Sequence, residues 1–289
     1  MSRSAEVVRF HLTNTANTRV FDFAVGGARM KLVGGDSGRR EHERFVESVI
    51  VAPSERVVVD VRFEAPGEAA LEHRTPARTY RLGSVRVAGD DLHSEAGAAF
   101  ETLRTNGELV AERERIKAYL DAEPDKIVAL VAELDVGGAH DHHAPPAHAG
   151  HHDGAAIEWE DGMVELNRAT TSQNTRWKLV DRATGAAGAG IDWRFKVGDQ
   201  VKIRLVNELE SDHPMHHPFH IHGAGRFLVL ARDGLPEDNL VWSDTVLSLP
   251  GEELDLLLDV THAGRWMAHC HIAEHHESGM VFGFDVDHG

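Results

Sequence analysis

One cysteine and the histidines on either side of it are the residues whose types and spacing can do chemistry. Cys270 is the single cysteine of this 289-residue sequence, and it stands between His269 and His271. With no partner for an internal disulfide, a cysteine in this position is a candidate ligand or nucleophile. Side chains of a β-strand alternate between its faces, so a strand over 266–271 directs Cys270 to one side and both histidines to the other. One strand can therefore serve two metal centres.

Two further ligand types follow the cysteine at steps of five residues, His275 and Met280. Thiolate, imidazole and a weak axial thioether are the donors of a blue-copper site, which needs two imidazoles and one thiolate. The second imidazole is available in His217, at the start of the segment HPFHIH, where Pro218 stiffens the turn into a strand. These residue types predict a mononuclear copper centre.

The segment HPFHIH contains two more histidines, His220 and His222, which are two positions apart and so share one face of a strand. We expect that face to complement the one that carries His269 and His271. For the preceding His213 and His216, a position outside the site is favoured over a role beside it.

The elements that must position these residues form a repeat of strand-like segments. Period-two alternation between closely spaced turn signals is typical of an all-β sandwich. We interpret the pattern as two homologous sandwiches. The matching segments are VRFHLTN, FDFAVGG, MKLVGGDSG, SVIVAPSER and VVVDVRF between residues 8 and 63, against VKIRLVN, HPFHIHG, RFLVLARDG, TVLSLPGEE and LDLLLDV between residues 201 and 260.

The two copies differ at the positions that carry the chemistry. The first copy is predicted to be a structural domain, because the places of His217, His220 and His222 are taken there by Phe21, Ala24 and Gly26. The second copy also has residues 157–200 before its first matching strand, whereas only seven residues precede Val8. A sandwich without its opening strands exposes an edge, so we expect the chain to begin inside a domain.

A connector separates the copies. Residues 97–121 favour a helix that Gly107 interrupts, and 125–136 favour a strand. The tract HDHHAPPAHAGHHDG at 140–154 is of low complexity and is more typical of a disordered connector than of a metal site. The predicted division is a domain without ligands over 1–89, a linker over 90–156 and a ligand-bearing domain over 157–289.

Composition limits the partners. The formal net charge of −17 argues against nucleic acid and anionic membrane surfaces as partners. No apolar run reaches the roughly 18 residues that a membrane-spanning helix needs. The first ten residues, MSRSAEVVRF, lack the apolar core of a signal peptide.

The motifs resemble those of the multicopper oxidases (laccases, cuprous oxidases, ascorbate oxidase, bilirubin oxidase), whose C-terminal cupredoxin domain carries HPxHxH and HCHxxxHxxxGM. The resemblance implies two cupredoxin-like Greek-key β-sandwiches joined by a partly helical, His-rich linker, the first sandwich being similar to the family's ligand-free middle domain. It also implies type 1 copper on His217, Cys270, His275 and Met280, type 2 copper on His220, and a type 3 pair on His222, His269 and His271.

The family's activity is implied in the same way. A small-molecule or metal-ion reducing substrate would give single electrons to type 1 copper, and Cys270 with its flanking His269 and His271 would pass them to a trinuclear cluster that reduces dioxygen to water. The resemblance also implies a periplasmic or secreted location. A phenol, cuprous ion, ferrous ion and bilirubin all stay open as the substrate.

The sequence departs from the family at two places. Four further cluster ligands come, in the family, from two His-x-His pairs of an N-terminal cupredoxin domain, and no such pair precedes residue 140. We therefore expect this chain to need that domain as a partner and, alone, to hold type 1 copper without reducing dioxygen. The second departure is His276, where family members often have an acidic residue.

Two other functions compete with this interpretation. One is a copper-binding electron-transfer or copper-storage protein, and the other is a copper nitrite reductase. The His-Cys-His triplet argues against both, because a mononuclear site has no use for His269 and His271 on the opposite face of the strand.

Overall fold

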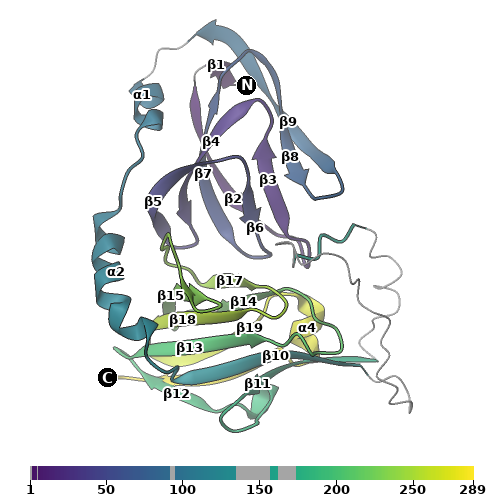
Figure 1. The fold of residues 1–289 in the computed structure, drawn as a ribbon, viewed down its shortest axis with the longest axis vertical. Helices are drawn as coiled ribbons and strands as arrows, with labels where there is room; N and C mark the ends of the chain where they lie inside the picture. Colours follow the sequence, from purple (N-terminus) through teal and green to yellow (C-terminus); the bar gives the residue numbers. More distant parts are fainter. Residues whose placement is uncertain (1, 5, 92–94, 135–156, 162–173) are drawn as a thin grey trace. The chain divides into compact units, whose positions relative to one another are not determined.

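The computed structural model describes residues 2–4, 6–91, 95–134, 157–161 and 174–289 (Figure 1). The chain forms two compact units, Met1–Arg115 with Asp238–Trp242, and Ile116–Glu237 with Ser243–Gly289. Each unit is built on a pair of β-sheets. The prediction of an all-β protein with two sandwiches is confirmed.

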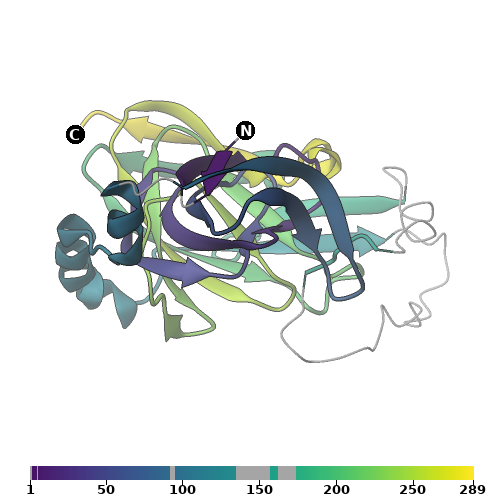
Figure 2. The same ribbon diagram turned by 90° about the horizontal axis from the view of Figure 1, so that it is seen from above.

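The first unit pairs a five-stranded sheet, in the order β1-β9-β8-β3-β6, with a four-stranded sheet, in the order β2-β7-β4-β5. The 13-residue β9 is curved along its length (Figure 2). The strands are β1 Ser2–Ser4, β2 Val7–Thr13, β3 Phe21–Val25, β4 Ala28–Gly35, β5 Gly38–Val46, β6 Val49–Val51, β7 Arg56–Phe63, β8 Gly67–Arg74 and β9 Thr79–Asp91.

Two helices follow the first set of strands, α1 (Glu95–Glu101) and α2 (Gly107–Leu120). The interruption predicted at Gly107 is therefore a boundary between helices. Asn106 caps the start of α2, since its Oδ1 accepts a hydrogen bond of 3.2 Å from the backbone N–H of Glu108. No helix among the described residues is both long and apolar enough to cross a membrane.

The second unit has a six-stranded sheet in the order β11-β10-β13-β18-β15-β16 and a five-stranded sheet in the order β12-β20-β19-β14-β17. Its short helical elements are η1 (Gly188–Gly190) and α4 (Ala273–Ser278). Its strands are β10 Lys126–Leu134, β11 Thr175–Asp181, β12 Trp193–Lys196, β13 Gln200–Asn207, β14 His217–Ile221, β15 Gly225–Arg232, β16 Leu235–Pro236, β17 Thr245–Ser248, β18 Glu253–Val260, β19 Gly264–Cys270 and β20 Val281–Asp287.

The strand orders confirm the internal repeat. The order β2-β7-β4-β5 of the first unit matches β13-β18-β15-β16 of the second, and β1-β9-β8-β3-β6 matches β12-β20-β19-β14-β17. Both five-stranded sheets also begin with a parallel pair, β1 with β9 and β12 with β20. The histidine-bearing β14 thus holds the same place in its sheet as the ligand-free β3.

The second unit has two strands that the repeat does not match, β10 and β11. β10 runs parallel to β13 and antiparallel to β11, so the two extend the sheet beyond β13. The strand predicted at 125–136 is confirmed as β10. It does not act as a connector, although it lies within the predicted linker of 90–156, because its hydrogen bonds are those of the second unit's sheet. The boundaries proposed for the domains stay a prediction, and the tract at 140–154 lies outside the described residues.

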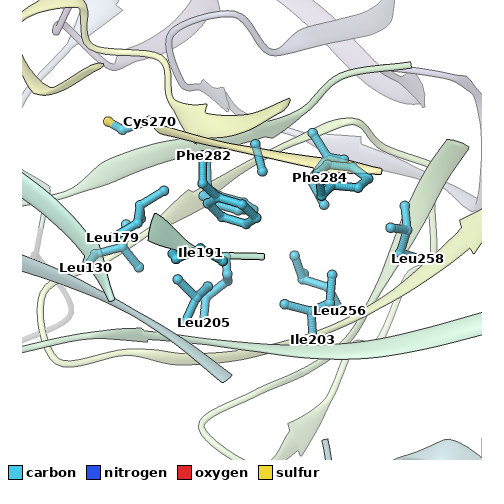
Figure 3. Packing of buried hydrophobic residues seen from close by; sticks show 14 of the residues in the cluster. Leu130, Leu179, Ile191, Ile203, Leu205, Leu256, Leu258, Cys270, Phe282 and Phe284 are labelled. Carbon is cyan, nitrogen blue, oxygen red and sulfur yellow. The ribbon is translucent and has the colours of Figure 1, made fainter. Parts of the chain in front are cut away.

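The antiparallel strands β10 and β11 complete the core of the second unit. The inward-facing Ile203 and Leu205 of β13 are 1% and 0% exposed, whereas Phe10 and Leu12 at the matching places of β2 are only half-buried. Within the described residues of the first unit, β2 pairs with β7 alone. Figure 3 shows Cys270 at the margin of the second unit's apolar cluster, with its sulfur directed away from Phe282.

Each unit carries the same ion pair, between β2 and β7 in the first unit and between β13 and β18 in the second. Arg9 holds Asp60 through two hydrogen bonds of 2.7 and 2.9 Å, and Arg204 holds Asp255 with the same two distances. The second pair has an additional partner, because Nζ of the buried Lys202 lies 3.1 Å from Asp255. Lys202 also donates to the last carbonyls of α2 and the turn after it, those of Tyr119, Leu120 and Ala122.

Candidate metal centres

Strand β19 separates the candidate ligands into two groups, as the alternation predicts. It lies between β14 and β20, and its register with β14 places Phe219 opposite Cys270 and His220 opposite His269. Cross-strand partners share a face of the sheet. Cys270 therefore points to the side of Phe219, while His269 points to the side of His220.

The first group is formed by Cys270, His217 and His275, which come from β19, β14 and α4. The Cys270 Sγ lies 3.6 Å from Nδ1 of His217 and 3.6 Å from Nδ1 of His275, and the two Nδ1 atoms are 3.1 Å apart. All three side chains are buried. Their donor atoms converge on one point, which is the arrangement that binds a metal ion.

Met280 closes the loop that carries His275. Its side chain is fully buried, its N–H donates to the carbonyl of His275 at 2.9 Å, and its carbonyl accepts from the N–H of Cys270 at 3.0 Å. The chain turns back at Gly279, whose φ of 133° lies in the region that favours glycine. The turn holds the backbone of Met280 beside those of Cys270 and His275.

Burial sets the charge of the first group. It raises the pKa of Cys270 to about 12 and lowers the pKa of His217 to about 3. It also places the pKa of His275 well below its ordinary value. In the absence of a metal, the group is one neutral thiol and two neutral imidazoles. Neutral imidazole is the form that binds a metal, whereas the thiol must lose its proton.

The second group lies on the opposite face of β19. The donor atoms of His220, His222 and His269 lie within 4.8 Å of one another, and Nε2 of His222 is 2.8 Å from Nε2 of His269. The ring of His271 is 5.9 Å from that of His220, between centroids. All four predicted imidazoles are thus brought together. Burial lowers the pKa of His269 to about 4, so this ring is neutral at physiological pH.

Hydrogen bonds orient two of these rings. Nδ1 of His269 lies 2.7 Å from the carbonyl oxygen of Cys270, and Nδ1 of His220 lies 2.8 Å from that of Asp244. A carbonyl only accepts, so Nδ1 carries the proton in both rings and the lone pair of Nε2 stays available as a ligand. Such an outer hydrogen bond is the usual way in which proteins fix a ligating histidine.

Three residues near the groups had no firm place in the sequence-based prediction. His276 stands edge-on to His269 with 4.9 Å between ring centroids, so it is a fifth imidazole at the second group. His216 is fully buried and accepts a hydrogen bond of 3.3 Å from the N–H of Glu158. The ring of Trp177 stacks on His275 and stands edge-on to His213. Trp177 was missed because its strand carries no ligand type that points to the site.

Comparisons with known proteins point to one family. A family model described as "Multicopper oxidase" matches residues 161–289, which include both groups. The chain is 23% identical to a laccase of Bacillus subtilis over 286 residues, which is 96% of this chain and 50% of the laccase. It is 37% identical to a multicopper oxidase, mco, of Staphylococcus aureus over 93 residues, which is 32% of this chain and 21% of that protein.

Solved structures agree on the fold. A multicopper oxidase of Campylobacter jejuni superposes with a TM-score of 0.62 at 20% identity, over 96% of this chain and 53% of the other. McoA of Aquifex aeolicus gives 0.61 at 20% identity, over 99% and 57%. The chain thus spans about half the length of the laccase and of these structures. The likeness confirms the cupredoxin-like β-sandwich fold.

The family match covers the residues on which the motifs stand, and the structure gathers those residues on the two faces of one strand. Residues 161–289, somewhat less than half of the chain, therefore match a multicopper oxidase domain.

Proposed function

We propose that this chain is the electron-accepting, C-terminal portion of a multicopper oxidase. In this proposal the first group, with Met280, holds type 1 copper, and the second contributes half of the ligands of a type 2/type 3 trinuclear cluster. One observation carries the proposal: the two groups stand back to back on β19 and are joined by the hydrogen bond from His269 to the Cys270 carbonyl. The ligands are His217, Cys270, His275 and Met280 for type 1 copper, His220 for type 2 copper, and His222, His269 and His271 for the type 3 pair.

The donor sets fit the metal. A soft thiolate with two imidazoles and a thioether selects copper, whereas a group of imidazoles alone suits several transition metals. The contact of 3.1 Å between Nδ1 of His217 and Nδ1 of His275 brings two potential donors face to face beside Sγ of Cys270. A metal ion bound by all three atoms replaces that crowded contact with three ligand bonds.

The chain's own residues prepare the chemistry. When bound, copper supplies one-electron transfer at the first group and, in a complete cluster, reduction of dioxygen to water. Cys270 gives up its proton on metal binding, and its burial keeps water from the thiolate. The short covalent path through the Cys270 peptide, with its hydrogen bond to His269, is the route by which we expect electrons to pass between the groups.

The cluster needs four further imidazoles beyond those of the second group. We expect its other four imidazoles to come from the His-x-His pairs of an N-terminal cupredoxin domain, because no such pair precedes residue 140. A polypeptide with this sequence should therefore hold type 1 copper and yet fail to reduce dioxygen by itself. Its reducing substrate is a small molecule or a metal ion, and its expected location is the periplasm or the outside of the cell, as in the family that it resembles.

The alternative is a copper-binding electron-transfer or storage protein. That function requires the first group and leaves the convergence of His222 and His269 without a role. The alternative gains support if copper binds at the first group and never at the second.

The test is a copper titration of the metal-free chain, followed by absorption and electron paramagnetic resonance spectra. We expect an intense thiolate-to-copper band, with the narrow hyperfine splitting of type 1 copper, and a second, colourless class of bound copper. Oxygen uptake with a phenolic dye should be absent, and should appear when the chain is joined to an N-terminal cupredoxin domain that carries two His-x-His pairs. The absence of a thiolate band would contradict the assignment of the first group, and sustained oxygen uptake by the chain alone would contradict the need for further ligands.

A further inference from the structure

Trp177 contacts both imidazoles of the first group, although it belongs to the other sheet of the unit. It lies on the edge strand β11, opposite Ala132 of β10. Its ring stacks on His275 with centroids 3.7 Å apart and 21° between the planes. It stands edge-on to His217, with centroids 5.6 Å apart and an angle of 72°. The indole is 5% exposed, so it forms part of the wall of the site.

The backbone of β11 is bonded to the helix that carries His275. The N–H of Trp177 donates to Oγ of Ser278 at 2.9 Å, and that hydroxyl lies 3.5 Å from the carbonyl of Thr175 as a donor. A Cβ at Gly279 would lie 3.1 Å from the carbonyl of Trp177, so the strand and the turn are closely packed. This hydrogen bond and close packing therefore hold the C-terminal end of α4 against strand β11.

These contacts matter because α4 by itself cannot fix the position of the His275 side chain. The helix has six residues and no side-chain cap at its N-terminus. Helices of this length are unstable in isolation, and their geometry depends on tertiary contacts. The stacked indole fixes the plane of the His275 ring, and the hydrogen bond to Ser278 fixes the helix along its axis.

We propose that Trp177 is a positioning residue for His275, which sets the orientation of this ligand and excludes water from it. This inference rests on the proposed function, because it takes His275 to be a ligand of type 1 copper. Cupric copper carries more charge than cuprous copper, so water and other polar surroundings stabilise the oxidised form more. Exclusion of water from His275 by the indole of Trp177 therefore favours the reduced form of the copper and raises the reduction potential of the site.

The chain offers a matched control in Trp193. This residue is also a buried tryptophan of the second unit, 2% exposed, and its ring stands edge-on to Phe282 with centroids 4.7 Å apart. Its indole N–H donates to Asp181 at 2.7 Å. In the described part of the chain, its ring does not contact the ring of His275. Loss of Trp193 thus perturbs the same core without touching the candidate ligand.

The experiment compares Trp177→Leu, Trp177→Phe and Trp193→Phe with the wild-type chain. In the metal-free protein, the ring protons of His275 should show an upfield shift in NMR spectra from the stacked indole, and Trp177→Leu should abolish that shift. In the copper-loaded protein, Trp177→Leu should favour cupric over cuprous copper at least tenfold, which lowers the reduction potential by about 59 mV. It should also let azide bind to the copper. Trp177→Phe should retain most of the wild-type potential.

Trp193→Phe should lower the unfolding temperature and leave the potential and the NMR shift unchanged. The positioning role is overturned if Trp177→Leu leaves both the His275 shift and the potential at wild-type values, or if Trp193→Phe changes the potential equally. A wild-type chain without a thiolate band would instead contradict the proposed function itself, and the two failures are thereby distinguished.

Discussion

The imidazole of His269 donates a hydrogen bond of 2.7 Å from Nδ1 to the backbone carbonyl of Cys270, its neighbour in sequence. The two side chains point to opposite faces of β19, so this bond connects the two candidate metal groups through one peptide unit. It also leaves Nε2 of His269 directed at His222, 2.8 Å away. The alternation of side chains along β19 and the tautomer of His269 thus determine how the two groups are connected.

Replacement of the Cys270 thiol should alter copper binding at the first group and leave copper binding at the second group intact. In Cys270→Ser, the intense thiolate-to-copper band should be lost, because a hydroxyl is a much poorer ligand for copper than a thiolate. Copper should still bind to the imidazoles of the second group, whose donor atoms come from the opposite face of β19. A copper titration followed by absorption and electron paramagnetic resonance measures both. The matched variant His222→Ala should keep the band and lose the colourless copper, and loss of both classes in either variant would contradict two separate groups.

Replacement of the axial thioether should raise the reduction potential of the first group. Met280 is fully buried, and Leu has a similar volume, so Met280→Leu should cost less than about 1.5 kcal/mol of stability. Removal of a weak axial donor disfavours the cupric form. We expect at least a tenfold change in favour of cuprous copper, which is about 59 mV. Redox titration of the thiolate band measures it. Met267→Leu, at a partly exposed position of β19, serves as the control, and an unchanged potential in Met280→Leu would contradict an axial role.

The thiol of the metal-free chain should be unreactive until the protein unfolds. Cys270 is fully buried, and burial raises its pKa to about 12, so very little of the reactive thiolate is present near neutral pH. Alkylation by iodoacetamide at pH 8 should be slow in the native protein and complete in urea, as measured by mass spectrometry. Bound copper should protect the thiol further. Rapid modification of the native metal-free protein would show that the site opens to solvent.

The ion pair of the second unit should matter more for stability than its match in the first. Asp255→Asn leaves the buried Lys202 without its carboxylate, which should cost about 3–5 kcal/mol. Asp60→Asn removes only the partner of Arg9, whose side chain is 53% exposed, and should cost about 1 kcal/mol or less. Urea unfolding, combined with hydrogen exchange of the amides of β13 and β2, measures the loss of stability in each unit separately. Equal losses of stability in Asp255→Asn and Asp60→Asn would contradict the role assigned to Lys202.

The same pair predicts a dependence on pH. Burial by itself raises the pKa of Asp255, but hydrogen bonds from Arg204 and Lys202 outweigh it and hold the pKa below its ordinary value. A folded-state pKa below the unfolded value of about 3.9 stabilises the protein above that pH. The difference in stability between the wild type and Asp255→Asn should therefore be full at pH 7 and disappear as the pH falls through the folded-state pKa. A difference that persists at the lowest pH would contradict this origin.

Much of the fold follows from local patterns. Period-two alternation predicts the strands, and the similarity between residues 8–63 and 201–260 predicts a repeat that the two strand orders confirm. The partner of β10 could not be predicted, because alternation shows that a strand exists and not which edge it joins. The same reason hid Trp177, which reaches His275 only because β11 forms the edge beside α4.

The sequence by itself determined the ligand types and the face on which each one lies, since the side-chain period of a strand separates Cys270 from His269 and His271 without reference to the rest of the fold. Only the tertiary structure decided that His217 and His275 reach Cys270 from two other elements, that His276 joins the second group, and that the first group is buried. Convergence and burial depend on contacts between segments far apart in the chain. Spacing along one strand therefore cannot predict them.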